Sequence, residues 1–440
     1  MDYIHPIQIG EILRKRRKEM GLRLEDLADD FISPSTISNI ERGITYVNED
    51  KVRYVAEKLN INLDQIHDLI AKEKQEEAHM ELQLAAIENM IDLMSPDKGL
   101  ERLRKLDVPN NHLLSAIVHF LRGKIYLQKR NWVKAQNHFL EAIRIVDQKE
   151  EWLKTNIKAA SYHELSRIAF SNHDLGQALR YVNEGLEHFQ AGGERAYYIY
   201  ILEIARITYL NELDHIEEAL RRINQIWDEI HHIKSIEVVL ELYKVRISIL
   251  RKLKLYEEAI AYAHQGIEVA RINKKTEQSC ELWSRLGTIY LLQHKWEEAE
   301  NCFRTALSLQ EKIKSDHMKI KAHTYLGLAY LEQDKDEAAA ETLLEALAIS
   351  DRTPHPEIYR ESYILMGDCY VKQGNTAEAI KIYEKALKMA QKKKDYEQER
   401  KIVLKLARCF ENADKQKFQI YLEQLYKLDI REHAKMPIAF

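Results

Sequence analysis

Glycine and proline are scarce in this 440-residue sequence, which contains 14 and 7 of them. Folds with many tight turns between strands need more of both residues, so the scarcity disfavours a sheet-rich protein. Charged residues make up 31% of the chain, as expected for long helices with solvated outer faces. A chain of this length exceeds one ordinary core, so we expect an all-α protein with several domains or a stacked array.

The sequence also lacks the marks of disulfides, membrane spans and export. Its four cysteines (Cys280, Cys302, Cys369 and Cys409) lie far apart without a CxxC pair, so we expect buried thiols rather than a disulfide frame or a metal site. No apolar run approaches the roughly 18 residues of a membrane span, and the N-terminus lacks the basic-then-apolar order of a signal peptide. These absences predict a cytoplasmic protein with no membrane partner.

Motifs of catalysis are missing as well. The HExxH, GxGxxG, GxxxxGK[ST] and GxSxG patterns do not occur. The pairs His163-Glu164 and His231-His232 lack the spacing of metal ligands, and a solvated turn is the simpler explanation for the second pair. We therefore expect a protein that is not an enzyme and that needs no metal or cofactor.

What the chain does contain is a repeat. Seven alanines recur at an almost constant spacing: Ala135, Ala178, Ala219, Ala259, Ala299, Ala339 and Ala379. A nearly fixed period of this size, about 40 positions, is typical of stacked helical units, in which each unit buries its apolar face against its neighbours. The repeat therefore points to binding before it points to chemistry.

Each unit has the pattern of two packed helices. In the best-formed one, Leu286, Gly287 and Tyr290 share a stripe of the first helix, and Ala299 and Phe303 share a stripe of the second. Small residues suit the points where helices cross closely, and large ones fill the space beside them. This pattern resembles the tetratricopeptide repeat, with units somewhat longer than its usual length of about 34 residues. The resemblance implies a right-handed superhelical array of about nine helical hairpins over residues 81–440. Three earlier units keep the alanine but replace the glycine, by Ser166, Ile207 and Ile247.

Residues 1–70 break this period and predict five short helices, the fifth carrying Leu63, Ile66, Leu69 and Ile70. The third helix has strong boundary signals: Ser33 can cap it, Pro34 suits its first turn, and Gly43 can end it. Five short helices with a polar third one fit a helix-turn-helix DNA-binding domain. We expect a helical linker over 71–80 between this domain and the array.

The N-terminal region also resembles a known family. Residues 10–17 (GEILRKRR) and 37–43 (ISNIERG) resemble the phage-repressor/Cro type of helix-turn-helix domain, and the resemblance covers about residues 7–70. One departure is at Arg23 and Leu24, where members of that group often have Ser and then a Gln that clamps a phosphate.

The third helix and the basic residues around it form the expected DNA-binding surface. Short polar side chains on the helix can enter the major groove, and arginines can contact phosphates, whereas Ile37 and Ile40 should be core. The expected residues are Arg14, Arg17, Arg23, Ser33, Ser35, Thr36, Ser38, Asn39 and Arg42. The alternative for each is a solvated helix face with ordinary caps. Residues 1–75 contain 12 Lys/Arg against 14 Asp/Glu, so we expect useful affinity only from a dimer on an inverted repeat.

The combination of the two parts resembles the cytosolic regulators of Gram-positive bacteria that bind secreted signalling peptides, the Rap/Rgg/NprR/PlcR/PrgX group, and its NprR branch in length and number of units. The resemblance implies a quorum-sensing-type transcription regulator. Its partners would be double-stranded operator DNA, a short signalling peptide and further copies of the chain, as a homodimer or higher oligomer.

The peptide would lie in a groove lined by the first helix of each hairpin. Polar and basic side chains there can hold a peptide backbone and its carboxylates, although each can also serve packing or an interhelix ion pair. The expected peptide-binding residues are His163, Arg167, Tyr200, Thr208, Asn211, Lys244, Ser248, Arg251, Ser284 and Thr288.

Two other functions remain open at this point. The array could bind a protein and act as an inhibitor of a phosphorelay component, or the chain could be a phage-encoded peptide receptor that controls the lysis-lysogeny decision.

Overall fold

The computed structural model describes residues 6–44, 48–62, 66–108, 112–309, 312, 315–354, 356–393 and 395–433. Within these ranges the chain consists of α-helices, short 3-10 helices and connecting turns, with no β-strand, so the predicted all-α fold is confirmed. Among the described helices, none combines the length and the apolar character that a bilayer crossing requires.

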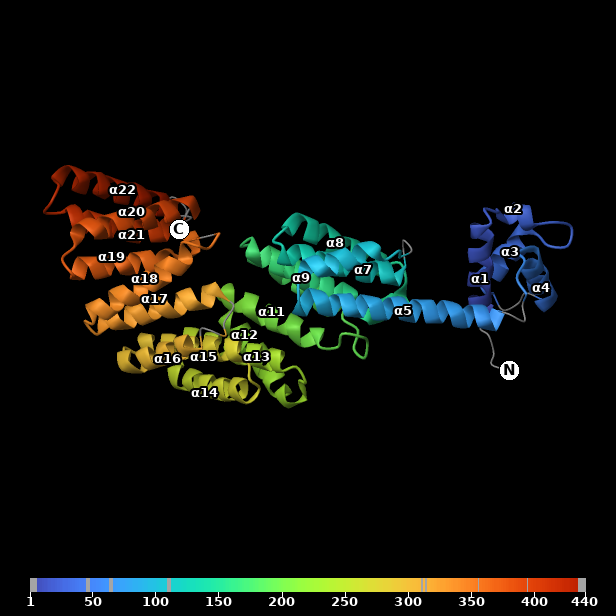
Figure 1. The fold of residues 1–440 in the computed structure, drawn as a ribbon, viewed down its shortest axis with the longest axis horizontal. Coiled ribbons are helices and arrows are strands. Elements are labelled where there is room, and N and C mark those ends of the chain that lie inside the picture. The colour runs from blue at the N-terminus through green and yellow to red at the C-terminus, as the bar shows by residue number, and fades with distance from the viewer. Residues whose placement is uncertain are drawn as a thin grey trace, which may run out of the picture. The chain divides into compact units, whose positions relative to one another are not determined.

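The first helices are α1 (Pro6–Glu19), α2 (Leu24–Leu27), α3 (Pro34–Glu41) and α4 (Glu49–Lys58), as expected for the N-terminal domain (Figure 1). The expected fifth helix falls on residues 63–70. Residues 63–65 lie outside the described residues, and 66–70 form the start of α5 (Ile66–Leu93), which continues without a break through 71–80.

A small apolar core joins helices α1 to α4. Leu13, Ile37, Val55 and Leu59 are completely buried in it. At Gly10, α1 passes so close to α3 that a Cβ atom would lie 2.4 Å from the carbonyl oxygen of Ile40. The opposing atom belongs to the backbone and cannot rotate away, so glycine is required at this crossing.

Within the described residues, nine consecutive helix pairs follow, in agreement with the expected number of repeat units. The two helices contact each other in the pairs that begin with α5, α7, α11, α13, α15, α17, α19 and α21. Figure 1 shows several of these pairs side by side, for example α17 with α18. The pairs are α5 with α6 (Pro96–Lys105), α7 (Leu113–Gln128) with α8 (Trp132–Val146), α9 (Ile157–Ser171) with α10 (Leu175–Glu187), α11 (Tyr198–Glu212) with α12 (Ile216–Trp227), α13 (Ile236–Lys252) with α14 (Tyr256–Ile272), α15 (Thr276–Leu292) with α16 (Trp296–Ser308), α17 (Asp316–Glu332) with α18 (Asp336–Ser350), α19 (Arg360–Lys372) with α20 (Thr376–Lys393), and α21 (Tyr396–Phe410) with α22 (Lys415–His433).

The chain divides into two compact units, Met1–Ile168 and Ala169–Phe440, and the division falls inside α9. In the second unit, the first helices of consecutive pairs also contact each other, from α11 through α13, α15 and α17 to α19. These first helices therefore form one continuous layer. The domain boundaries expected at residues 70 and 80 stay predictions.

The periodic alanines and glycines lie where the two helices of a pair meet. All seven repeated alanines are completely buried. Opposite them, a Cβ on Gly123 would lie 2.5 Å from the Phe139 ring, and one on Gly287 would lie 2.7 Å from the Phe303 ring. Three units lack this glycine. One of them holds Ile247 and Ala263 at the equivalent positions, so the large residue lies on the first helix, whereas another holds Ile207 and Ile223, which are both large and completely buried. Glycine at this crossing therefore makes room for a large side chain on the facing helix and is not required in every unit.

A second periodic feature was not anticipated from the sequence. Each first helix from α7 to α19 is followed by a residue in the left-handed backbone region, five positions before the repeated alanine. Six of these residues carry side chains, with φ between +55° and +61°: Arg130, His173, Asp214, Lys254, His294 and Asp334. Among these seven units, only that of α19 and α20 has the glycine that this conformation favours, Gly374, at a φ of +76°.

The cysteines are free thiols inside this array, as expected. Cys280, Cys302 and Cys369 are buried, and Cys409 is half-buried. Burial raises the pKa of the Cys280 thiol to about 11 and that of Cys302 to about 12. Both are therefore protonated and unreactive at neutral pH.

Replacing Gly287 by Ala should destabilise the second unit by about 1–3 kcal/mol, because the new methyl group overlaps the Phe303 ring. Urea unfolding measures the change. Gly176→Ala is the matched control, because a Cβ there meets nothing closer than 3.8 Å, and alanine should add up to about 1 kcal/mol of helix stability. Combining Gly287→Ala with Phe303→Leu should cost less than the sum of the two single changes. Full additivity would contradict the proposed overlap.

Lys254→Gly should stabilise the second unit by about 0.5–1 kcal/mol, because glycine has no Cβ to strain the left-handed conformation at a φ of +59°. Lys254→Ala removes the same exposed side chain but keeps the Cβ. Thermal unfolding should therefore rank glycine above both lysine and alanine. Equal stability of the glycine and alanine variants would show that this residue carries no strain.

Candidate DNA-binding helix and ligand pocket

Helix α3 presents the polar face that the sequence predicts. Ser33 caps it by accepting a hydrogen bond of 3.3 Å from the Thr36 backbone N–H. Ile37 and Ile40 are buried, whereas Ser35 is exposed. Among the remaining expected contacts, Thr36, Ser38 and Asn39 are half-buried. The two isoleucines therefore anchor the helix in the core, and the residues between and before them present hydroxyl and amide groups on its other side.

A buried ion pair fixes the end of α3. The Arg17 Nε donates to Glu41 Oε1 at 2.6 Å, and Nη2 donates to Oε2 at 2.9 Å. Nη1 donates to the Leu22 carbonyl oxygen at 2.7 Å. Only 11% of the Arg17 side chain and 5% of the Glu41 side chain are exposed. This arrangement favours a structural role for Arg17 over the phosphate contact expected from the sequence.

The other expected phosphate contacts lie at the surface. Arg14 in α1 and Arg42 at the end of α3 are exposed. Arg23 is also exposed, and its backbone N–H donates to Asp26 Oδ2 at 2.7 Å, which leaves the guanidinium outside this cap. These three arginines are therefore accessible to a polyanion.

Asp29 organises the turn before α3, a role that the sequence does not reveal. Its Oδ1 accepts from the backbone N–H groups of Phe31 and Ile32 at 2.9 and 3.0 Å. Its Oδ2 accepts from Lys58 at 2.5 Å and from the Tyr54 hydroxyl at 2.6 Å. The hydrogen bond from Lys58, followed by that from Tyr54, holds the pKa of the Asp29 carboxyl well below its usual range. The turn that positions α3 is thus tied to α4.

In the first unit, the expected residues His163 and Arg167 flank a buried carboxylate. His163 Nδ1 lies 3.4 Å from Glu164 Oε1, and Arg167 Nη1 lies 2.7 Å from Oε2. Burial opposes ionisation of Glu164, but these two partners outweigh it and lower the pKa to about 2. Both expected side chains therefore lie against Glu164, for which the sequence predicts no role in binding.

In the second unit, four expected residues lie along the first helices without forming one site. Tyr200 is half-buried against the local core, and the Thr208 hydroxyl donates to the Ile204 carbonyl oxygen. Asn211 is buried, and its backbone oxygen accepts from Lys252. Lys244 is buried between Glu241 and Glu281 and forms ion pairs of 2.5 and 2.7 Å with them. The last of these pairs joins α13 to α15.

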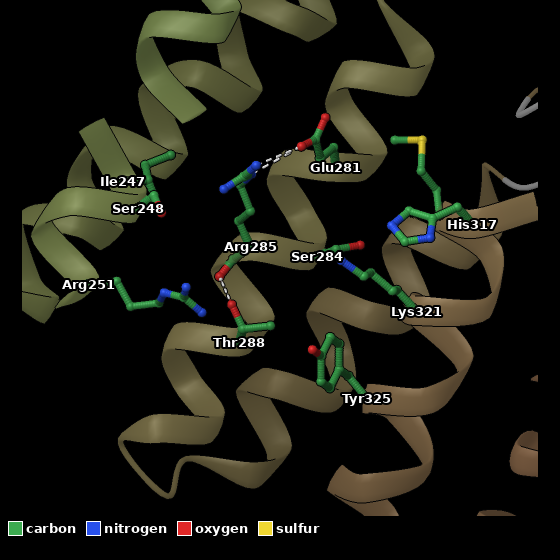
Figure 2. A pocket seen from close by; sticks show the side chains of 11 residues that line it. Ile247, Ser248, Arg251, Glu281, Ser284, Arg285, Thr288, His317, Lys321 and Tyr325 are labelled. Carbon is green, nitrogen blue, oxygen red and sulfur yellow. Dashed lines mark hydrogen bonds and ion pairs between the residues drawn. The ribbon is translucent and has the colours of Figure 1, made fainter. Parts of the chain in front are cut away.

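The remaining four expected residues come together. Ser248, Arg251, Ser284 and Thr288 line one pocket of about 270 Å³, shown in Figure 2. Its walls come from three successive first helices, α13, α15 and α17. The residues that complete it were not singled out from the sequence: Ile247, Glu281, Arg285, His317, Met318, Lys321 and Tyr325.

A signal for two of these missed residues is present in the sequence. Lys321 and Tyr325 stand one full repeat period after Glu281 and Arg285. Extending the expected groove by one unit would have included them.

A second pocket of about 250 Å³ adjoins the first and shares Arg251, Thr288 and Tyr325 with it. Its other walls are mainly apolar: Leu291, Leu292, Trp296, Leu328 and Glu332. The layer of first helices therefore offers a polar compartment beside an apolar one.

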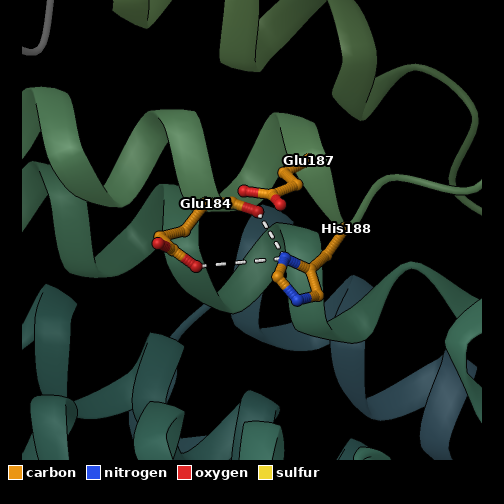
Figure 3. A group of neighbouring side chains, drawn as sticks. All are labelled: Glu184, Glu187 and His188. Carbon is orange, nitrogen blue, oxygen red and sulfur yellow. Dashed lines mark hydrogen bonds and ion pairs between the residues drawn. The ribbon is translucent and has the colours of Figure 1, made fainter.

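One cluster outside these surfaces consists of residues of the types that bind metal ions. Glu184, Glu187 and His188, at the end of α10, have ligand atoms within 4.8 Å of one another (Figure 3). The two glutamates are exposed, and His188 Nδ1 lies 3.0 Å from the Glu184 carbonyl oxygen, so the ring is engaged at the helix end. All three come from one turn of one helix, and we assign no metal to them.

Comparisons with protein families identify both parts of the chain. A helix-turn-helix model matches residues 13–66, and tetratricopeptide repeat models match residues 278–352 and 361–398. The chain joins a helix-turn-helix domain to tetratricopeptide repeats. No model of a catalytic family is among these matches. No curated protein matches the sequence.

Solved structures show the same fold at low sequence identity. A signal transduction ATPase with a tetratricopeptide repeat sensor, from Pyrococcus horikoshii, matches 97% of this chain with a TM-score of 0.58 and 15% identity, and this chain spans 63% of its length. A Rap protein complexed with competence and sporulation factor matches 78% of this chain and 99% of its own, with a TM-score of 0.51 and 11% identity. The structure of Bacillus thuringiensis PlcR with the peptide PapR7 and DNA has a TM-score of 0.37, which is too low to add to this comparison. The expected resemblance to the Rap-containing group is confirmed at the level of the fold.

Arg17→Ala should destabilise the helix-turn-helix domain by about 2–4 kcal/mol, because Glu41 would remain buried without its partner. Hydrogen exchange of the amides in α1 and α3 measures this loss. Arg16→Ala is the control, since Arg16 is exposed and pairs with the exposed Glu19 on the same helix. The double variant Arg17→Met/Glu41→Leu should recover most of the stability. Normal exchange in Arg17→Ala would rule out the structural role.

Proposed function

We propose that this protein is a cytoplasmic transcription regulator that binds operator DNA as a homodimer and is controlled by a short peptide held against the first helices of its repeats. The proposed DNA binding rests on the structure of α3. It belongs to the segment matched by the helix-turn-helix family, and its polar residues face outward while Ile37 and Ile40 hold it in the core. Such a helix is suited to the major groove.

The peptide half is supported by the two adjoining pockets. Apart from Trp296, at the start of α16, their lining comes from three consecutive first helices. It combines hydroxyl, cationic and apolar side chains, which are the groups that hold an extended peptide. The Rap protein of similar fold was crystallised with competence and sporulation factor. A ligand that contacts α13, α15 and α17 together would favour one spacing of these helices, and it would change DNA binding only if its affinity differs between the two forms.

Dimerisation is proposed from charge. Residues 1–75 carry 12 basic and 14 acidic side chains, so nonspecific attraction to DNA is weak. Two linked recognition helices on an inverted repeat would supply the missing affinity. An inhibitor that only binds another protein would not need a DNA-binding domain. The helix-turn-helix domain therefore favours a transcription regulator over such an inhibitor.

Selection of random duplexes by the full-length protein at low salt should recover an inverted repeat with half-sites about one helical turn apart. Asn39→Ala should relax the preference at one position of each half-site, at a cost of about 1–3 kcal/mol. Arg14→Ala should weaken all sequences alike and reduce the slope of log affinity against log salt by about 1. Lys388→Ala, an exposed lysine of α20, is the control and should bind normally. Failure to retain any duplex would refute the proposed DNA binding.

A further inference from the structure

The pocket between α13, α15 and α17 contains two cationic side chains that form no ion pair with the described residues. Arg251 lies on α13 and Lys321 on α17, and in Figure 2 both side chains extend into the same space. Within the described part of the chain, neither side chain forms a hydrogen bond or an ion pair. This differs from Lys244 and Arg285, which both contact Glu281.

The charges around the pocket leave a positive excess. Among the residues that line it, Arg251, Arg285 and Lys321 are cationic and Glu281 is anionic. Beside them, Lys244 pairs with Glu241 and Glu281, and Glu361 interacts with Lys321 from α19. Partial burial, followed by the positive charge of Arg285, lowers the pKa of Lys321, and partial burial lowers the pKa of His317. A ligand that brings a negative charge would relieve the repulsion among these cations.

The neighbouring compartment indicates which kind of group in the ligand lies next to its negative charge. Leu291, Leu292, Trp296 and Leu328 form its apolar wall, and Glu332 is its one acidic lining residue. It meets the cationic compartment at Arg251, Thr288 and Tyr325. Since the two compartments share these residues, one ligand can occupy both. Each compartment, at about 270 and 250 Å³, has room for a side chain rather than for a folded domain.

From this juxtaposition we propose that the peptide recognised here is acidic. It places a carboxylate, from Asp, Glu or its own C-terminus, between Arg251 and Lys321, and a large apolar side chain against Trp296. The inference rests on the proposed peptide binding and specifies its ligand class. A free phosphate would satisfy the cations but would leave the apolar compartment empty, so a peptide accounts for both.

The test uses the full-length protein, immobilised, and a random heptapeptide library with free C-termini. Retained peptides are sequenced by mass spectrometry. The wild-type protein should enrich Asp, Glu or a terminal carboxylate next to a large apolar residue. Amidated copies of the retained peptides then distinguish a terminal carboxylate from a side chain, and inorganic phosphate as competitor tests for simple anion binding.

Two sets of variants locate the effect. Arg251→Glu/Lys321→Glu should weaken the acidic peptides about tenfold or more and enrich Lys and Arg instead, because the sign of the pocket is reversed. Arg251→Gln/Lys321→Gln should lose the acidic preference without gaining the basic one. Trp296→Ala should lose the apolar preference alone, and Lys388→Glu, an exposed charge change on α20, should alter nothing. Circular dichroism confirms that each variant is folded.

The outcomes separate the two proposals. If the wild-type protein retains peptides without an acidic preference, or if the charge-reversed variant keeps that preference, the inference is wrong while peptide binding stands. If no peptide is retained by the wild-type protein, peptide binding itself fails. Complete displacement of the acidic peptides by millimolar phosphate, with no apolar preference, would show a simple anion site and overturn the inference.

Discussion

The close crossing of two helices within each repeat unit is the constraint on which the array depends. Ala299 is completely buried there, and Gly287 leaves room for the Phe303 ring. In the second unit, consecutive first helices from α11 to α19 also contact each other. Side chains one repeat period apart, such as Ser248 and Thr288 or Glu281 and Lys321, therefore meet in one pocket. The packing of the core thus sets which polar groups face each other outside it.

The same residue types serve either structure or recognition, according to their surroundings. Arg17 is enclosed with Glu41 and stabilises the helix-turn-helix domain, whereas Arg14, on the same helix, is exposed. In the array, Lys244 is buried between two glutamates in ion pairs, whereas Lys321 forms no ion pair with the described residues. A buried charge needs a partner from the protein, whereas an accessible charge remains available to a ligand.

Much of the fold follows from local patterns. The signals at Ser33, Pro34 and Gly43 describe α3 closely, because caps and turns depend on neighbouring residues. The left-handed residues after each first helix escaped prediction for the opposite reason. Residues such as Arg130 and Lys254 have no intrinsic preference for that conformation, and only the requirement to pack the next helix imposes it.

By itself, the sequence determined the helical class, the repeat period, the helix-turn-helix head and the outward polar face of α3. These properties depend on periodicity and on short-range chemistry, which are legible along the chain. Only the tertiary structure decided which of the expected groove residues meet. Ser248, Arg251, Ser284 and Thr288 share a pocket, while Lys244 and Asn211 are buried. The partners of a side chain depend on residues one or two repeat units away. The local sequence pattern therefore does not show whether a charged side chain has an oppositely charged neighbour.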